Sequence, residues 1–227
     1  MNPARLLALL VLLPLVLGGC GKKKEPDAVN NPDLEGVNNS KIVRISGIAY
    51  RIGSSTPYSG KSFQLDANGN KRAKANWKDG KYEGLVEVWH ESGQKAFEIN
   101  YKDGKLNGLG LEWHDNGTKK ANANWKDGKY IDLVVKWHDN GQKQFEANYK
   151  YGGKKDGFVY TWHENGQKRS EENWKDGEED GLIVMWHKNG QKQSELNYKN
   201  GKPVEGSEKF WNSKGEPVNS EEEAFAE

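Results

Sequence analysis

Glycines recur through this chain at a nearly constant interval. One series closes Asn-Gly-type turns 24 or 25 residues apart, at Gly69, Gly93, Gly117, Gly141, Gly166, Gly190 and Gly215. A second series runs half a period out of step, at Gly80, Gly104, Gly128, Gly153, Gly177 and Gly201. Repetition at a period of this length indicates one supersecondary unit stacked many times, each copy burying its apolar surface on its neighbours. A residue that recurs in every copy is therefore expected to serve the architecture first.

The sequence between these glycines predicts β-hairpins. In a representative unit, 84–105, residues 85–90 and 95–102 are short runs rich in Val, Trp, Phe, Ile and Tyr. Ser92-Gly93 and Asp103-Gly104 bound these runs. Asn-Gly and Asp-Gly supply the positive φ of tight hairpin turns, whereas two glycines in every unit disfavour a helix. We predict an all-β fold, a single-layer twisted antiparallel meander of repeated hairpins.

Alternation along the strands predicts which side chains share a face. The first strand of each unit carries an apolar triple that ends on Trp, such as Leu133, Val135 and Trp137. The second strand carries an aromatic column at Trp77, Tyr101, Trp125, Tyr149, Trp174 and Tyr198. Period-2 alternation specifies register strongly. We therefore expect the two columns to form one aromatic face with the Trp residues as its core, and the His, Asn, Lys and Glu side chains to form an opposite, polar face.

The repeated string resembles a known family. It reads Trp-His-x-Asn-Gly-Gln-Lys and then Asn-Tyr/Trp-Lys-Asp-Gly-Lys, with a further glycine four residues on. This string is similar to the variant MORN repeat (membrane occupation and recognition nexus), and bacterial proteins made of it are commonly labelled YwqK-family antitoxins. The resemblance covers about 50–211, or about six full units and a partial one. It implies a single-layer β-meander used for binding or scaffolding.

The first twenty residues predict export and lipidation. Arg5 precedes an apolar run at 6–17, which is too short to span a bilayer as a helix and has the form of a signal-peptide core. The run ends in Leu17-Gly18-Gly19-Cys20, which resembles the lipobox of bacterial lipoproteins; the alternative is an ordinary secretory signal with an incidental cysteine. Because Cys20 is the single cysteine, we expect it to be lipidated and to anchor the protein in the cell envelope. Gly21 suggests the outer membrane, on its periplasmic or surface side, if the cell has one.

The chain is therefore expected to have five segments. Residues 1–19 form a lipoprotein signal peptide, and 20–40 form the lipidated cysteine and a flexible polar tether. Residues 41–60 form a capping strand and entry segment, 61–218 the repeat array, and 219–227 an acidic, frayed tail. Charged or irregular ends of this kind keep open sheets from stacking edge to edge.

We expect neither a metal site nor a catalytic site. All five histidines follow Trp in one column, at His90, His114, His138, His163 and His187. Equivalent residues of successive hairpins lie two strands apart, roughly 9.5 Å, whereas zinc requires ligands at about 2.0 to 2.1 Å. Each histidine is therefore expected to cap a strand end at its own turn. The chain has no Gly-x-Ser-x-Gly or His-Glu-x-x-His motif, so we predict a protein that is not an enzyme and needs no cofactor.

Charge and aromatic content leave three candidate functions. The formal net charge of +1 argues against nucleic acid as a partner, since such proteins carry a clear basic excess. The favoured function is a protein-binding scaffold for an unidentified envelope protein, held at the membrane by the N-terminal lipid. The alternatives are binding of cell-wall glycan through the aromatic columns and an antitoxin-like role. Specificity should lie where the copies deviate, and the candidate binding residues are Phe97, Phe145, Tyr151 and Tyr160.

Overall fold

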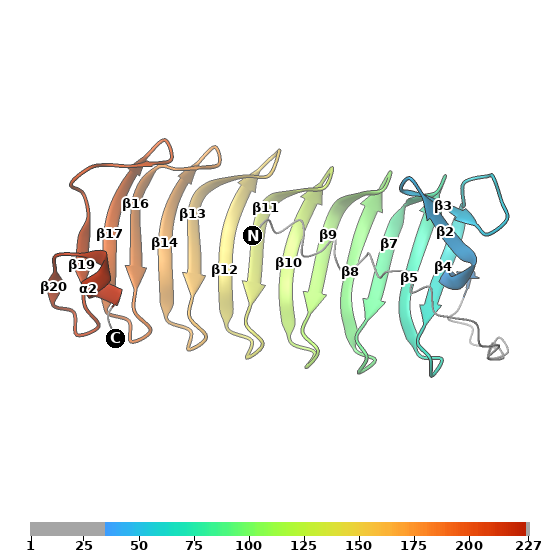
Figure 1. The fold of residues 1–227 in the computed structure, drawn as a ribbon, viewed down its shortest axis with the longest axis horizontal. Coiled ribbons are helices and arrows are strands. Elements are labelled where there is room, and N and C mark those ends of the chain that lie inside the picture. Colours follow the sequence, from blue (N-terminus) through green and yellow to red (C-terminus); the bar gives the residue numbers. More distant parts are fainter. Residues whose placement is uncertain (1–34, 226–227) are drawn as a thin grey trace. The chain divides into compact units, whose positions relative to one another are not determined.

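The computed structural model describes residues 35–225. The predicted signal peptide, Cys20 and most of the predicted tether lie outside these residues. Within them the chain forms one 18-stranded sheet and a separate two-stranded sheet. The strands of the large sheet lie side by side, and the successive strands of the array pair antiparallel (Figure 1). The predicted all-β meander of repeated hairpins is confirmed.

The repeat array consists of long strands joined alternately by two kinds of turn. Two of its long strands are interrupted by one residue, so that β6 and β7, for example, together correspond to the unbroken β9, and residues 204–208 separate β18 from β19. The strands of the array are β4 (Gly60–Leu65), β5 (Lys71–Lys78), β6 (Lys81–Tyr82), β7 (Gly84–Trp89), β8 (Lys95–Lys102), β9 (Lys105–Trp113), β10 (Lys119–Lys126), β11 (Lys129–Trp137), β12 (Lys143–Lys150), β13 (Lys154–Trp162), β14 (Lys168–Lys175), β15 (Glu178–Glu179), β16 (Gly181–Trp186), β17 (Lys192–Lys199), β18 (Lys202–Pro203) and β19 (Lys209–Trp211).

The two kinds of turn differ in backbone conformation. In the Asp-Gly turns both central residues have positive φ, as in Asp103 (49°) and Gly104 (79°), which is the type I′ turn that matches strand twist. In the Asn-Gly turns only the glycine is left-handed, as in Gly117 (83°). There the backbone N–H of His114 donates to the carbonyl of Thr118 at 2.9 Å and closes a longer loop. Both turns end the strands where the sequence predicts.

The register places the two aromatic columns on opposite faces. Tyr101 pairs with Gly84 and Phe97 with Val88, whereas Trp89 pairs with Lys95 across a β-bulge. Directly opposite residues of an antiparallel pair share a face, so Tyr101 lies on one side of the sheet and Trp89 on the other. The prediction of a single aromatic face is therefore wrong. Alternation sorts each strand by itself, but turn length and the bulge decide which sides of two strands coincide.

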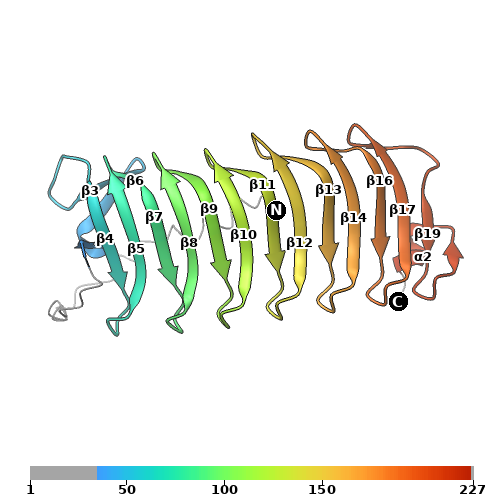
Figure 2. The same cartoon turned by 180° about the vertical axis from the view of Figure 1, so that it is seen from behind.

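The best-buried side chains lie on only one of these faces. Val86, Ile99, Val134, Ala147 and Val159 are each 3 % exposed or less. We call their side the capped face, because the β2–β3 hairpin and helix α2 lie on it, near its two ends (Figures 1 and 2). The other side, which we call the ladder face, carries the half-buried Trp89, Trp113, Trp137, Trp162 and Trp186. The expectation that this Trp column is the core is therefore corrected.

The N-terminal end of the sheet differs from the prediction of a tether to residue 40 followed by one capping strand. Strand β1 (Val37–Asn38) pairs in parallel with β4, and η1 (Asn39–Lys41) follows it. Strands β2 (Ile42–Ile45) and β3 (Ile48–Arg51) form a separate hairpin. The Arg44 guanidinium of this hairpin lies 5.9 Å from the Trp77 ring and 5.6 Å from the Tyr82 ring. Ordered structure therefore begins before residue 40, and it covers aromatic rings of the first unit.

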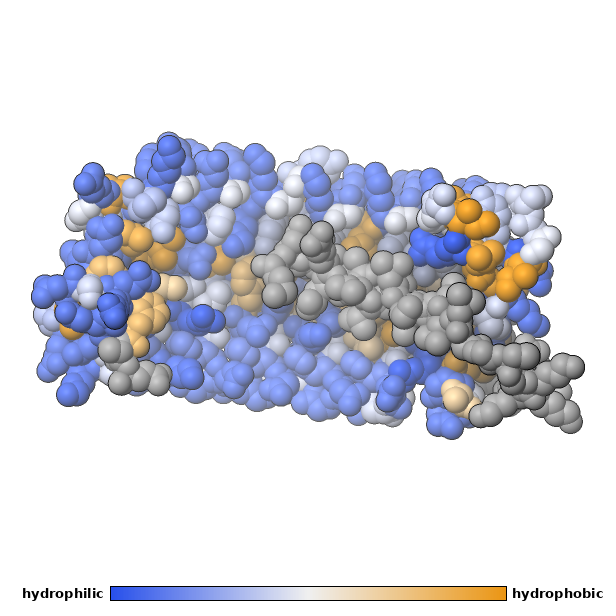
Figure 3. Space-filling model, in the orientation of Figure 1, coloured by the Kyte–Doolittle hydropathy of each residue, from blue (hydrophilic) through white to orange (hydrophobic). Residues whose placement is uncertain are grey.

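The C-terminal end is also more ordered than the predicted frayed tail. Strand β20 (Pro217–Val218) pairs with β19, and helix α2 (Glu221–Phe225) packs on β17 and β19. Ala224 in this helix is fully buried. Figure 3 shows the capped face, with hydrophobic residues gathered between hydrophilic margins. The described residues include no helix with the length and apolar character needed to cross a membrane.

Candidate binding face

One row of the capped face does not repeat from unit to unit. It crosses the strands, each member lying directly opposite the next, and we call it the variable row. Its members are Gln64, Ala73, Val88, Phe97, Glu112, Ala121, Lys136, Phe145, Thr161, Ser170, Met185, Ser194 and Phe210. At about 4.8 Å per strand the row is roughly 55 Å long. Size, charge and polarity all change along it.

The neighbouring row of the same face, which we call the core row, behaves differently. Val134, Ala147 and Val159 follow one another across it, alternating small and branched side chains that are almost fully buried. Close packing constrains such residues strongly. The side chains of the variable row are not held to one type by the repeat, although they occupy equivalent places in equivalent hairpins. Phe97, Ser170 and Ser194 are buried, and the other members of the row are half-buried. Variation at structurally equivalent positions that solvent reaches is typical of a binding surface on a repeat protein.

The middle of the capped face contains two partly buried lysines beside aromatic rings. The Lys136 ammonium lies 5.7 Å from the centre of the Phe145 ring, and the Lys155 ammonium lies 5.9 Å from it. Lys155 also lies 3.9 Å from the centre of the Trp174 ring. Burial lowers the pKa of both ammonium groups, although Glu112 acts against this at Lys136. Lysine stems that cover aromatic rings in this way keep their charged ends toward solvent.

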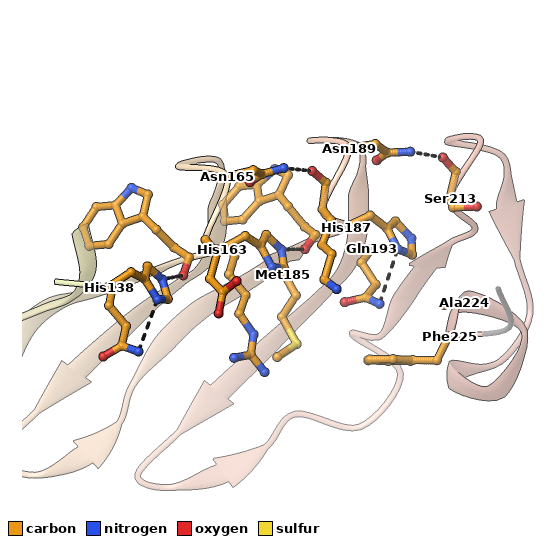
Figure 4. A pocket seen from close by; sticks show the side chains of 16 residues that line it. His138, His163, Asn165, Met185, His187, Asn189, Gln193, Ser213, Ala224 and Phe225 are labelled. Carbon is orange, nitrogen blue, oxygen red and sulfur yellow. Dashed lines mark hydrogen bonds between the residues drawn. The ribbon is translucent and has the colours of Figure 1, made fainter. Parts of the chain in front are cut away.

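A groove of about 940 Å³ lies toward the C-terminal end of the capped face. Met185 of the variable row, Arg169 and Gln193 line it together with a row of histidines, and Phe225 of α2 borders it (Figure 4). Three of the described turns contribute His138, His163 and His187 to its wall. The variable row therefore passes into a hollow at this end.

Comparison with known families assigns the repeat. Four segments, at residues 82–103, 133–151, 155–176 and 179–200, match the MORN repeat variant. Four hairpin repeats of the array are MORN repeat variants. No curated protein matches the chain. All four of these repeats contribute residues of the variable row from both their strands, such as Lys136 and Phe145 or Met185 and Ser194.

Histidine side chains join each hairpin unit of the array to the next. The imidazole Nε2 atoms of His90, His114, His138, His163 and His187 lie 2.9 to 3.0 Å from the carbonyl oxygens of Trp113, Trp137, Trp162, Trp186 and Trp211. A carbonyl oxygen only accepts, so Nε2 carries the hydrogen. At His138 the other ring nitrogen then accepts from Gln144 at 3.4 Å. The predicted cap within the same turn is thus replaced by a bond to the following unit.

Asparagines of the same turns form a second set of links between the repeats. Asn140 donates from Nδ2 to the carbonyl of Glu164, and Asn165 donates to that of Lys188, each at 2.6 Å. Their Oδ1 atoms accept a backbone N–H within their own turn. The recurring His and Asn of these turns therefore hold one edge of the array together. Among the described residues, no group of three His, Cys, Asp or Glu side chains is arranged to hold a metal ion.

The ladder face is occupied by contacts between lysines and tryptophans. A lysine of each repeat lies over the Trp ring of the next, with the ammonium 5.1 to 5.9 Å from the ring centre, for Lys71 and Trp89, Lys95 and Trp113, Lys119 and Trp137, Lys143 and Trp162, Lys168 and Trp186, and Lys192 and Trp211. Most of these lysines also pair with a glutamate, as Lys143 does with Glu146 at 2.6 Å. The Trp rings of this column are therefore covered.

The four binding residues predicted from sequence do not form one site. Phe97 and Phe145 belong to the variable row, with Phe97 only 4 % exposed. Tyr160 lies on the ladder face in a stack with Phe158 and Trp162, at 5.8 and 5.9 Å between ring centres. Tyr151 is at a turn, 74 % exposed, and donates to Asp127 Oδ2 at 3.2 Å. The prediction missed Lys136 and Lys155, which an alignment of the repeats would have marked as deviations from Val88 and Tyr82.

Proposed function

We propose that this protein is a non-catalytic binding scaffold that holds a segment of another protein along the variable row. The variable row is the observation that carries this proposal. The repeats of this chain share the turns and the inter-unit histidine bonds, and they differ along the variable row. A partner lying across the strands would meet apolar, acidic, basic and hydroxyl side chains in a fixed order. Such an order of side chains can select one partner sequence by binding alone, without any catalytic group.

The packing of the aromatic rings, which leaves few ring faces open, favours a protein partner over a cell-wall glycan. A sugar-binding platform needs an exposed ring face, but the ladder-face Trp rings lie under lysines. On the capped face, Trp125 and Tyr130 are 4.0 Å apart between ring centres, and Tyr130 and Tyr149 are 5.2 Å apart. Burial raises the pKa of Tyr101 and Tyr130 to about 12. An antitoxin-like role rests on the family resemblance alone, and no contact favours it.

Site-specific photo-cross-linking tests this function. A benzophenone amino acid placed at Phe145 or Met185 of the capped face should give adducts of the same partner in intact cells. Placed at Phe158 or Leu182 of the ladder face, which are 46 % and 39 % exposed, it should give at least tenfold less of that adduct. Adducts formed equally from both faces, or from the ladder face alone, would remove the capped face as the binding surface.

We also propose that Cys20, outside the described residues, is lipidated and anchors the scaffold in the cell envelope. The apolar run at 6–17, which is followed by Gly18, Gly19 and the sole cysteine, supports this. Wild-type protein should enter the detergent phase in a Triton X-114 partition, and Cys20→Ser should stay in the aqueous phase with an uncleaved or differently cleaved N-terminus. Equal partition of the two proteins, with the same mature mass, would show that Cys20 carries no lipid.

A further inference from the structure

The charged groups of the two faces are paired differently. On the ladder face, half-buried lysines have carboxylates close by, such as Glu87 and Glu98 at 2.9 and 2.6 Å from Lys95 and Glu171 at 2.6 Å from Lys168. On the capped face, Lys120 pairs with Glu112 at 2.7 Å. Lys136 and Lys155 have no carboxylate within ion-pair distance among residues 35–225. Two ammonium groups therefore share the middle of the capped face without an ionic partner.

Two of the carboxylates around these lysines, those of Glu112 and Glu172, already bind other partners. Glu112 pairs with Lys120, and it raises the pKa of Lys136 only from beyond ion-pair distance. Glu172 accepts hydrogen bonds from Ser170 Oγ at 3.0 Å and from Trp174 Nε1 at 2.8 Å. Glu172 and Glu179 raise the pKa of Lys155 from beyond ion-pair distance. A partly buried cation without a partner is costly, and a carboxylate that arrives with a ligand removes that cost.

Lys136 and Lys155 are the only cations at their two positions among the described repeats; Glu112 and Glu179 are the other charged residues there, and the remaining repeats carry uncharged residues. Lys136 occupies the place of Val88, Thr161 and Met185 in the variable row. Lys155 pairs with Tyr149 as Tyr82 pairs with Trp77 and Tyr130 with Trp125, so it replaces a tyrosine that would extend the aromatic stack. The fold accepts an uncharged side chain at each place, so folding alone does not explain two lysines facing the ring of Phe145.

The chain's own C-terminal segment shows what kind of sequence this face accommodates. Helix α2 reads Glu-Glu-Glu-Ala-Phe, and it lies on β17 and β19, the strands that carry the last members of the variable row. Its Ala224 is fully buried while Phe225 is half exposed at the border of the groove. The three glutamates are exposed, so a short acidic segment is seated on the capped face through its apolar residue.

We propose that Lys136, Phe145 and Lys155 form a subsite for an acidic side chain, flanked by an apolar one, in an extended segment of the partner protein. This rests on the proposed function and names the chemistry of the partner. The carboxylate lies between the two ammonium groups, and the neighbouring apolar side chain packs on the Phe145 ring. The subsite sets the register of the segment, because the rest of the variable row has only one other charged residue, Glu112, which is already paired.

Selection from a random peptide library tests the subsite. The probe is a phage-displayed library of about 16 residues, the extended length that spans the row. Peptides selected on the wild-type protein should be enriched in Asp or Glu next to an apolar residue. Selection on the Lys136→Met/Lys155→Met variant should not show this enrichment. The matched control is Lys143→Met/Lys168→Met, which removes the same charge from the ladder face and should select the wild-type motif.

Affinity of one selected, fluorescein-labelled peptide then measures the effect. Anisotropy should show roughly tenfold or greater weakening by Lys136→Met/Lys155→Met, since hydrogen bonds to charged groups are among the stronger ones. Lys136→Arg/Lys155→Arg should restore most of the affinity, and circular dichroism should show that each variant is folded. Added salt should weaken binding to wild type more than to the methionine variant.

The outcomes separate this subsite from the proposed function. Peptides that bind the capped face without acidic residues, or that bind the methionine variant as tightly as wild type, would overturn the subsite and leave the scaffold function standing. Recovery of no peptide from the wild-type protein would overturn both. Acidic peptides whose binding is lost with the ladder-face control, and not with the methionine variant, would also overturn the subsite.

Discussion

An Ile99→Ala/Gly110→Val double variant is expected to be more stable than either single variant, although both changes lie in the core row. Ile99 is 2 % exposed, and it pairs directly with Gly110. Elsewhere in the row the same pair is an alanine opposite a valine, as in Ala147 and Val159. One unit has therefore exchanged a small–large pair for a large–small pair of similar total volume.

Each single change disturbs this pair in an opposite direction. Ile99→Ala leaves a cavity and should lower the free energy of unfolding by about 2 to 5 kcal/mol. A Cβ at Gly110 would lie 2.8 Å from Ile99 Cδ1 and 3.0 Å from Trp125 Nε1, so Gly110→Val should cost about 1 to 3 kcal/mol by overpacking. In the double variant the new valine fills the cavity, so the two effects should offset each other by a coupling of about 0.5 to 3 kcal/mol.

Urea unfolding of the wild type, the two single variants and the double variant measures this coupling. The midpoints should fall in both singles and largely recover in the double, with little change in the slope against denaturant. Simple addition of the two losses would show that the Ile99 and Gly110 side-chain positions do not share one space.

Trp125→Ala should destabilise the protein far more than Trp137→Ala, although the two residues look alike in the repeat. Trp125 is 3 % exposed and packs on Tyr130 of the capped face, so its loss should cost about 3 to 5 kcal/mol. Trp137 is half-buried on the ladder face, with the Lys119 ammonium 5.5 Å from its ring centre. Loss of that contact and of partial burial should cost about 1 to 2 kcal/mol.

Thermal or urea unfolding of the two variants compares them directly. Trp113→Ala provides a control, because Trp113 occupies the same ladder-face column under Lys95 and should behave like Trp137→Ala. If Trp137→Ala and Trp113→Ala proved the more damaging changes, the core would lie on the ladder face and the register described above would be wrong.

The sequence predicts the hairpins well because their signals are local. Positive φ at Asp103 and Gly104 depends on residues at the turn itself, and strand alternation depends on neighbours two positions away. The assignment of faces depends on the bulge opposite Trp89, where an extra residue shifts one strand against the next. Each strand therefore shows its own pattern, but the sequence gives no local sign of which side of Trp89 will meet Tyr101.

The binding face was only partly predictable for a related reason. Phe97 and Phe145 stand out as aromatic deviations between units, and both lie in the variable row. Lys136 and Lys155 look like ordinary surface charges in a chain that is 30 % charged, and only their position beside Phe145 distinguishes them. The seating of α2 could not be foreseen, because a tail of three glutamates has the composition of a solvated segment and only Ala224 is buried.

The histidine bonds all run in one direction along the array, and they place no limit on the number of units. Every imidazole reaches forward to the Trp carbonyl of the following unit, and the series stops where Asn212 follows Trp211 in place of histidine. A tandem duplication of one unit would bring its own donor and its own acceptor, and it would leave both terminal caps untouched. Internal copying of the gene could thus lengthen the ribbon by about 9.5 Å per added hairpin. Each added hairpin would add two positions to the variable row, so a longer segment of a partner could be recognised.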